Sequence, residues 1–204
     1  MFGGNKSVSF KPEKDIPALD GKVILVTGGN IGLGKQSVLE YARHNPALIW
    51  LGARNLDKAR AAVEEIKQQV ANAPIEVLEI DLSSLASVEK AARKVVAESE
   101  RLDILMLNAG IMAAPPGLTC DGYELQFGTN YVGHALLAKL LLPLLEKTAA
   151  LPDADVRIVA LTSRGHDMAP SKGIQFNTLK TDGNSLGPLE RYGQSKLADI
   201  LWAR

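Results

Sequence analysis

The sequence predicts an α/β fold in which one doubly wound parallel sheet is covered by helices on both faces. Short apolar runs of strand length alternate with longer segments of helical periodicity along most of the chain. The apolar runs are continuous rather than alternating, which is typical of strands buried on both faces of a parallel sheet. A glycine-rich turn follows the first run directly. We therefore expect a Rossmann-type domain that binds its ligands beyond the carboxyl ends of the strands.

The expected elements alternate in a regular order. The strands are residues 23–26, 48–51, 75–80, 104–107 and 156–161, and the helices are residues 33–44, 56–71, 85–100 and roughly 123–149. Asp121 and Gly122 are plausible entry signals for the longest helix. A last helix follows a long polar stretch after Ser163. The apolar run 135–145 is interrupted and far shorter than the ~20 residues of a membrane span, so we expect a buried helix there.

The composition limits which classes of binding partner and which cellular compartment are expected. The 204 residues are 46% hydrophobic and 23% charged, which suits a single domain at residues 20–204 after a polar lead-in at residues 1–19 without a secretory signal. Basic and acidic residues both number 23, so neither nucleic acid nor an anionic membrane is expected as a partner, while a homo-oligomer remains open. The single cysteine, Cys120, excludes an internal disulfide and a cysteine-cluster metal site. A cytoplasmic location and no metal centre are expected.

The turn at residues 27–34 reads TGGNIGLG and predicts a phosphate-binding cradle. Gly28, Gly32 and Gly34 allow a sharp turn and a close approach of backbone N–H groups to an anion at a helix N-terminus. Residues 29–35 also fit most of the P-loop pattern G-x-x-x-x-G-K-[ST], but Gln36 stands where the magnesium-binding hydroxyl belongs. A dinucleotide cradle of the form TG-x-x-x-G-x-G, a P-loop and a ligand-free turn all remain open at this point.

Residues that follow the later strands extend the cradle. Arg54 lies about 20 residues past the glycine turn, where an NAD site places an acid, so its guanidinium favours the 2′-phosphate of NADP; a solvated surface arginine is the alternative. Asp81 and Leu82 are positioned to contact an adenine, although Asp81 or Ser83 could equally cap the next helix. The small residues NAG at 108–110 let the backbone approach a nicotinamide ribose.

Tyr192 and Lys196 stand four positions apart in the last predicted helix, so their head groups can meet on one face. A nearby ammonium favours phenolate and lowers the pKa of a tyrosine from its usual value of about 10, which makes Tyr192 a credible proton donor or acceptor. On its own, such a pair occurs by chance in many surface helices. Asn130 is expected to be a structural hydrogen-bonding residue inside a helix, and His134 is not expected to be a ligand.

The combination of motifs resembles the short-chain dehydrogenase/reductase family in order and in placement on the elements. It consists of TGGNIGLG, Asp81, NAG at 108–110, Asn130, Ser163 and YGQSK at 192–196. The phrases NAGIM, DGYELQFGTNYVGHALL and YGQSKLA are most similar to the branch of retinol dehydrogenases and WW-domain oxidoreductases, and the resemblance begins near residue 20. It implies an oxidoreductase that interconverts a carbonyl and an alcohol without a metal. With Arg54 favouring NADP, the leading hypothesis is an NADP-dependent enzyme that acts on a fairly apolar substrate.

The resemblance also implies the roles of individual residues. Tyr192 would exchange a proton with the substrate oxygen, and Lys196 would bind the nicotinamide ribose and tune Tyr192. Ser163 would hydrogen-bond the substrate oxygen, and Asn130 would hold a water in the proton path. The implied cofactor-binding residues are Gly28, Asn30, Ile31, Gly32, Leu33, Gly34, Arg54, Asp81, Leu82, Asn108, Ala109 and Gly110, together with Tyr192 and Lys196.

The end of the sequence departs from the family pattern. Family members continue beyond the tyrosine helix with further strands and a substrate-covering segment, whereas this sequence stops at Arg204. We expect an incomplete sheet with one unpaired edge, weak NADP binding, and little turnover unless a C-terminal segment is restored. A catalytically idle dinucleotide-binding or interaction protein is the second hypothesis. A P-loop nucleotide hydrolase is the third, and Gln36 and the Tyr192/Lys196 pair argue against it.

Overall fold

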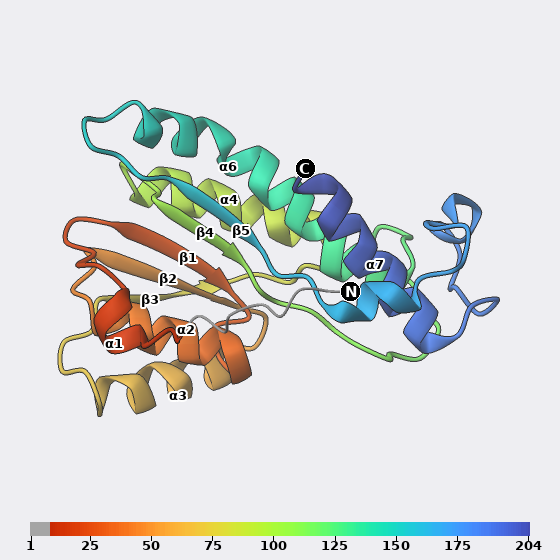
Figure 1. Cartoon of the computed structure of the whole chain (residues 1–204), viewed down its shortest axis with the longest axis horizontal. Coiled ribbons are helices and arrows are strands. Elements are labelled where there is room, and N and C mark those ends of the chain that lie inside the picture. Colours follow the sequence, from red (N-terminus) through yellow and green to blue (C-terminus); the bar gives the residue numbers. More distant parts are fainter. Residues whose placement is uncertain (1–8) are drawn as a thin grey trace.

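The computed structural model describes residues 9–204 and contains one five-stranded sheet in which all strands run parallel. Figure 1 shows the strands in the order β3-β2-β1-β4-β5, so that the winding reverses between β1 and β4. The predicted doubly wound sheet is confirmed. The strands are β1 (Val23–Thr27), β2 (Leu48–Ala53), β3 (Ile75–Glu79), β4 (Ile104–Leu107) and β5 (Arg157–Ala160).

Helices cover both faces of the sheet (Figure 1). They are α2 (Gly32–Ala42) and α3 (Leu56–Lys67) on one face, and α4 (Leu85–Glu98) and α6 (Gly133–Ala149) on the other. Alternate residues of a strand point to opposite faces. In β1, Ile24 and Val26 therefore join the α2/α3 core, whereas Val23 and Leu25 join the α4/α6 core. The continuous apolar run arises because each half of it faces a different core.

The α4 helix begins at Leu85 as predicted, but the capping residues suggested for α4 and for the next helix differ from those in the structure. The N-cap of α4 is Ser84, whose hydroxyl accepts from a backbone N–H of the first turn, and not Asp81 or Ser83. The Asp81 carboxylate instead accepts from the N–H and the hydroxyl of Ser83, at 2.9 and 2.7 Å. Asp121, expected to begin the next long helix, accepts from the Leu85 N–H at 2.8 Å and so supports the start of α4.

The long helix predicted before β5 consists of three consecutive pieces. α5 (Leu125–Phe127) is followed by the π-helical turn η1 (Gly128–Val132) and then by α6. In the π turn, the N–H of Gly133 bonds to the carbonyl of Gly128, five residues earlier. Asn130 lies at the centre of this turn, and such turns are frequent at functional sites. The apolar part of α6 is buried, as predicted, with Leu137 and Leu141 fully inaccessible.

β5 forms one edge of the sheet within residues 9–204, where it pairs with β4 alone. Ile158 and Val159 are 41% and 40% exposed, in contrast to the fully buried β1. The strand predicted at residues 156–161 is therefore a short edge strand. After it come the 3-10 turns η2 (Arg164–Met168) and η3 (Phe176–Thr178), and then α7 (Pro188–Trp202).

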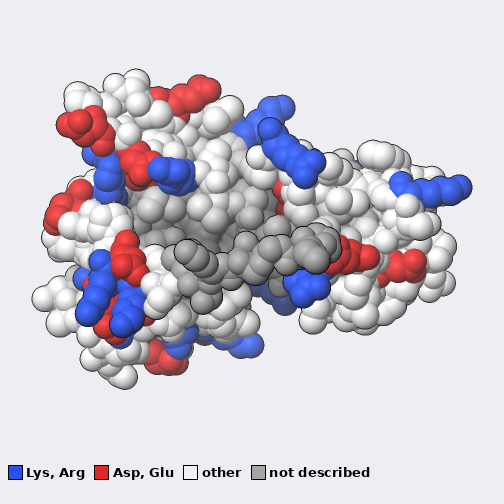
Figure 2. Space-filling view, viewed as in Figure 1, with Lys and Arg blue, Asp and Glu red and all other residues white. Residues whose placement is uncertain are grey.

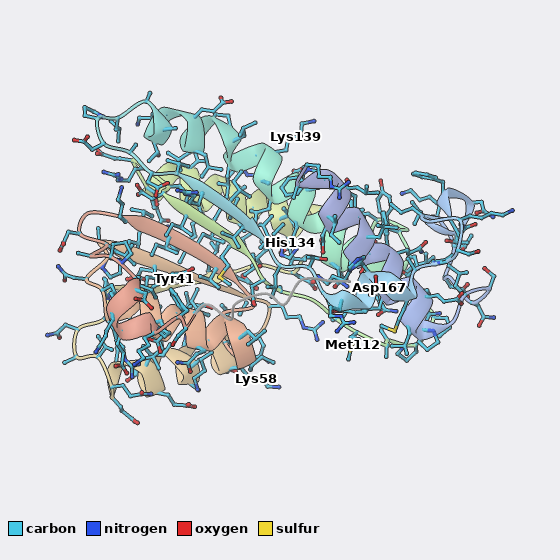
Figure 3. All side chains as sticks on the ribbon, in the orientation of Figure 1. Tyr41, Lys58, Met112, His134, Lys139 and Asp167 are labelled. Carbon is cyan, nitrogen blue, oxygen red and sulfur yellow. The ribbon has the colours of Figure 1, made fainter. Side chains whose placement is uncertain are left out.

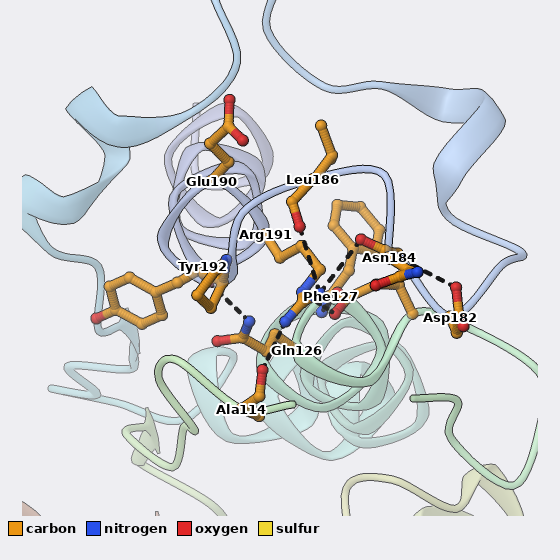
Figure 4. Close-up of polar contacts among 12 residues, drawn as sticks. Ala114, Gln126, Phe127, Asp182, Asn184, Leu186, Glu190, Arg191 and Tyr192 are labelled. Carbon is orange, nitrogen blue, oxygen red and sulfur yellow. Dashed lines mark hydrogen bonds and ion pairs between the residues drawn. The ribbon is translucent and has the colours of Figure 1, made fainter. Parts of the chain in front are cut away.

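One buried arginine ties the segment before α7 to the rest of the domain (Figure 4). Arg191 donates to the carbonyl oxygens of Gly183, Leu186 and Ala114 at 3.2, 3.4 and 2.6 Å. Its Nε lies 3.4 Å from the Glu124 carboxylate, and the two side chains are 1% and 0% exposed. In Figure 4, Tyr192 points away from this cluster, on another side of α7. The clamp therefore fixes the start of α7 without occupying the direction in which the tyrosine points.

The predicted lead-in at residues 1–19 is described only in part, since residues 1–8 lie outside the described residues. Its remainder includes the one-turn helix α1 (Pro12–Asp15) and ends at Leu19, which is buried in the α2/α3 core. Within residues 9–204, no helix combines the length and the apolar character that a membrane crossing requires. On the face drawn in Figure 2, basic and acidic side chains are intermingled around the helices that flank the sheet.

The close packing of α6 gives a first prediction. A Cβ added to Gly133 would overlap the backbone carbonyl oxygen of Leu82, which cannot move without shifting the turn after β3. Gly133→Ala should therefore lower the free energy of unfolding by about 1–3 kcal/mol, despite the better helix propensity of alanine. Gly117→Ala is the control, because the nearest atom to its Cβ would lie at 3.6 Å. Urea denaturation of both variants checks this, and equal stabilities would contradict it.

Candidate active site

A cavity of about 580 Å³ opens where the carboxyl ends of β1, β2, β3 and β4 meet. Parallel strands place all their carboxyl ends at one edge, so residues far apart in the sequence converge there. All twelve cofactor-binding residues that the sequence predicted in the strand-end turns line this cavity. They are Gly28, Asn30, Ile31, Gly32, Leu33, Gly34, Arg54, Asp81, Leu82, Asn108, Ala109 and Gly110, and they are joined by Thr27, Gly52, Ala53, Asn55, Lys58, Ile80, Ile111, Thr129 and Leu161.

The glycine turn has the geometry of an anion cradle. Gly28 and Gly32 have φ values of +66° and +54°, in the left-handed region that favours glycine. A Cβ at Gly34 would overlap the carbonyl oxygen of Gly28, so only glycine lets α2 begin this close to the end of β1. The N-cap residue of α2, Ile31, has no side chain that accepts from the first turn. The N–H groups at this helix N-terminus and the positive end of its dipole are therefore available to a phosphate.

The residues that would complete a P-loop are engaged elsewhere. The Lys35 ammonium forms an ion pair with Glu65 of α3, and Gln36 donates from its amide to Glu40 at 2.6 Å. Neither residue lines the cavity. A P-loop needs its lysine on the phosphates and a hydroxyl on magnesium, so these contacts argue against the nucleotide hydrolase hypothesis.

Two cations line the part of the cavity next to β2. Arg54 follows the strand, and Lys58 lies in the first turn of α3 and projects from it in Figure 3. Both are exposed, and within residues 9–204 neither forms an ion pair with an acidic side chain. The sequence analysis missed Lys58. Its position four residues after Arg54, one turn along a helix that starts at the cavity, was the available signal.

The Asn108–Gly110 loop is tied to the end of β1 by the Thr27 hydroxyl. This oxygen accepts from the backbone N–H groups of Asn108 and Ala109, both at 3.0 Å. The Asn108 amide donates to the Thr27 carbonyl at 2.8 Å. A Cβ at Gly28 would lie 3.0 Å from the Ala109 Cα, which shows how closely the loop approaches the glycine turn. Thr27, missed at the sequence level, therefore sets the distance between the two halves of the cradle.

Tyr192 and Lys196 both lie on α7, as predicted, and Lys196 contacts a residue that lines the cavity. The Lys196 ammonium donates to the Leu161 carbonyl at 2.8 Å and to Asp199 at 2.9 Å. It also lies 3.8 Å from the point that a Cβ on Gly110 would occupy. Leu161 and Gly110 are both lining residues of the cavity. The lysine is therefore adjacent to the end of the cavity opposite Arg54, although its charge is shared with a buried carboxylate that the sequence did not suggest.

The Tyr192 ring lies against Gly165 of η2, the turn whose N-cap is Ser163. The Ser163 hydroxyl accepts from the Gly165 N–H at 3.0 Å as the N-cap of η2. A Cβ on Gly165 would come within 2.6 Å of the Tyr192 ring, so the absence of a side chain there lets the phenol lie against the turn that carries Ser163.

Asn130 is buried between these parts, and both ends of its amide have protein partners. The oxygen accepts from the Ile111 N–H at 2.8 Å, and the nitrogen donates to the Ile111 carbonyl at 3.0 Å and to the Ser195 hydroxyl at 2.9 Å. This arrangement joins the loop after β4 to α7.

The comparisons with known proteins identify the family. The sequence model described as short chain dehydrogenase matches residues 22–180. An oxidoreductase of Schizosaccharomyces pombe is 45% identical over 93% of this chain and 56% of its own length, and human retinol dehydrogenase 13 is 39% identical over 91% and 54%. A crystal structure from Mycobacterium paratuberculosis is 34% identical over 93% of this chain and 63% of its own, with a TM-score of 0.75.

The chain belongs to the short-chain dehydrogenase family of oxidoreductases, whose members bind nicotinamide dinucleotides. Its similarity to retinol dehydrogenases agrees with the resemblance of its motifs to that branch. The chain spans a little over half the length of the two relatives described above.

The buried Lys196–Asp199 pair gives a second prediction. Burial raises the pKa of Asp199 from 3.8 to about 6, against the attraction of the Lys196 ammonium. Because this pKa is higher in the folded protein than in the unfolded chain, the free energy of unfolding falls as the pH rises through the interval between them. In the wild type, the free energy of unfolding should fall by about 3 kcal/mol over this interval, and Asp199→Asn should abolish this fall. Urea denaturation from pH 4 to pH 7 measures it.

The matched control for this titration is Asp57→Asn. The Asp57 side chain is 95% exposed and pairs with Arg60 on the surface of α3. Its replacement should leave the shape of the wild-type profile unchanged. Parallel profiles for wild type and Asp199→Asn would show instead that Asp199 remains ionised throughout this range.

Proposed function

We propose that the protein is an NADP-dependent oxidoreductase that interconverts a carbonyl and an alcohol, with Tyr192 as the acid and base. One observation carries the proposal: the glycine cradle and two cations line one cavity, and Lys196 on the Tyr192 helix donates to the carbonyl of Leu161, which also lines it. The nicotinamide would supply or accept the hydride. The chain's own residues bind the dinucleotide, orient the substrate oxygen and move a proton.

We infer that an extended dinucleotide would lie along the cavity. The phosphates would bind the N–H groups at the start of α2, beside Gly32 and Gly34. Arg54 and Lys58 would hold a 2′-phosphate, and Asp81 with Leu82 would contact the adenine. The loop at residues 108–110 would lie along the nicotinamide ribose. Arg54 and Lys58 form no ion pair within residues 9–204, and they stand where an NAD site needs one carboxylate, which supports NADP over NAD.

The proton chemistry belongs to the other end of the cavity. Tyr192 would donate its phenolic proton to the carbonyl oxygen in the reduction and take it back in the oxidation. The Lys196 charge would stabilise phenolate and bind the ribose hydroxyls, and Ser163 would donate a hydrogen bond to the substrate oxygen. The developing alkoxide is then stabilised by hydrogen bonds and one positive charge.

Apolar side chains near this end favour an apolar substrate. Met168 lies at the end of η2, with its methyl group 3.3 Å from the position of a Cβ on Gly165, beside the Tyr192 ring. Met112 follows the 108–110 loop and is 63% exposed (Figure 3). Methionine adapts to varied apolar shapes. We infer a small, fairly apolar aldehyde, ketone or alcohol as the substrate.

A catalytically idle dinucleotide-binding protein is the second candidate. The observation in its favour is the Lys196–Asp199 contact, because a paired carboxylate reduces the positive charge that the phenol needs. Both candidates require the cofactor to bind, so the effect of replacing Tyr192 on turnover distinguishes them.

Tyr192→Phe provides that test. The variant should keep its affinity for NADPH within about twofold and lose about 100-fold or more of its kcat on an aldehyde and ketone panel. Nicotinamide fluorescence measures the affinity, and NADPH consumption measures the turnover. Tyr41→Phe is the control, because the Tyr41 hydroxyl contacts Met106 Sδ away from the cavity. If both variants turn over substrate like the wild type, Tyr192 is not the acid.

Cofactor choice is tested separately at Arg54. Arg54→Asp should reduce the preference for NADPH over NADH by about 10-fold to 100-fold, because a carboxylate repels the 2′-phosphate and can bind a ribose hydroxyl. Lys58→Ala should give a smaller loss with the same sign. Arg60→Asp is the matched control on α3, since Arg60 pairs with Asp57 and does not line the cavity. An unchanged ratio of the two dissociation constants in Arg54→Asp would mean that Arg54 is only a surface charge.

A further inference from the structure

His134 lies in the interior of the molecule, on the first turn of α6, where it meets both halves of the proposed site (Figure 3). Its Nε2 is 2.8 Å from the Thr27 hydroxyl, and its Nδ1 is 2.8 Å from the Asn130 carbonyl oxygen. A buried histidine with a partner on each ring nitrogen has a defined tautomer, and that tautomer follows from the chemistry of the two partners.

The Asn130 side determines where the ring proton lies. A carbonyl oxygen can only accept, so Nδ1 must carry the hydrogen that it donates to Asn130. In a neutral imidazole the other nitrogen is then an acceptor. Burial lowers the pKa of His134 to about 4, and the nearby Lys196 charge lowers it further, which keeps the ring neutral. Nε2 therefore accepts from the Thr27 hydroxyl.

The Thr27 side requires the same assignment. Its hydroxyl oxygen already accepts from the N–H groups of Asn108 and Ala109, which uses both lone pairs. Its proton must therefore point to an acceptor, and His134 Nε2 at 2.8 Å is nearer than the Met106 carbonyl at 3.4 Å. A protonated imidazole would present an N–H to this oxygen and displace one of the two loop contacts.

The network continues from Asn130 to the catalytic helix. The Asn130 amide donates to Ser195 at 2.9 Å, and the Ser195 hydroxyl donates to the Tyr192 carbonyl at 2.7 Å. Hydrogen bonds thus link the end of β1, through Asn130 of the π turn, to the carbonyl of Tyr192 on α7. His134 connects the Thr27 end of this series to Asn130, and the Asn130 amide also bonds to Ile111 directly after the 108–110 loop.

We propose that His134 is a positioning residue, which as a neutral Nδ1–H imidazole holds the Asn108–Gly110 loop and the π turn at Asn130 in register. The structural role of His134 is independent of the proposed function, but its expected effect on cofactor binding rests on that function. The register would place the nicotinamide end of the cofactor against Tyr192, while the adenine end, held by Arg54 and the glycine turn, does not depend on it.

The tautomer is tested first and without any activity. Two-dimensional ¹H–¹⁵N spectra of the three histidines between pH 5 and pH 8 should show His134 as neutral Nδ1–H with no titration in this range. A His134 ring that titrates near the ordinary value of about 6.5, or that carries its proton on Nε2, would overturn the inference. This measurement stands even if the protein turns out not to use NADP.

The second test separates the two ends of the cofactor. His134→Phe keeps the ring volume and loses both hydrogen bonds, whereas His134→Gln retains one donor and one acceptor. His134→Phe should weaken NADPH binding about 10-fold and adenosine 2′,5′-bisphosphate binding less than about twofold, and His134→Gln should recover part of the NADPH affinity. Isothermal calorimetry gives both dissociation constants for each variant.

His44→Phe is the matched control, because the Nδ1 of His44 contacts the carbonyl of Glu40, four residues earlier, at 2.7 Å but lies outside the network. It should leave both affinities unchanged. Equal weakening of the two ligands by His134→Phe, or no difference between His134→Gln and His134→Phe, would reduce His134 to a packing residue. Failure of the wild type to bind NADPH at all would refute the proposed function and leave the tautomer result to decide this inference.

Discussion

The contact on which the site depends most is the one between the Thr27 hydroxyl and the two N–H groups at Asn108 and Ala109. β1 and β4 are neighbours in the sheet only because the winding reverses between them, and the crevice between their ends would otherwise be open. A hydroxyl at the last residue of β1 closes the distance without a bulky side chain. The glycine turn and the loop can then approach each other while leaving the cavity between them accessible.

The sequence predicted those parts of the site that depend on the chemistry of neighbouring residues. Three features could be interpreted from the sequence alone: a glycine-rich turn, an arginine after a strand, and a tyrosine and a lysine one helical turn apart. The doubly wound parallel sheet could also be predicted, since alternating strands and helices allow few topologies. The π turn at Asn130 was out of reach, because a one-residue change in helical pitch leaves no periodic signature over so short a segment.

Contacts between distant segments were also out of reach. The sequence offered Glu124 and Arg191 as two ordinary charges, 67 positions apart, yet the structure buries both of them against each other and against three carbonyl groups. Burial raises the pKa of Glu124, which shows how much solvation this carboxylate has lost. Removing either partner would leave an uncompensated buried charge, which costs far more than the pair contributes. Such a clamp is visible only once the segment between Ser163 and α7 is folded.

The same argument applies with more force to Lys196. The sequence predicts a lysine whose positive charge lies beside a phenol. In the structure, the Lys196 ammonium also pairs with the buried carboxylate of Asp199, one turn further along α7. Asp199 restrains the ammonium and reduces its field, so the two effects oppose each other: the lysine is better placed and less electropositive. Ribose hydroxyls would add acceptors on the free side of the ammonium without removing that carboxylate. In the proposed mechanism, Lys196 would therefore act on Tyr192 with a charge that it already shares with Asp199.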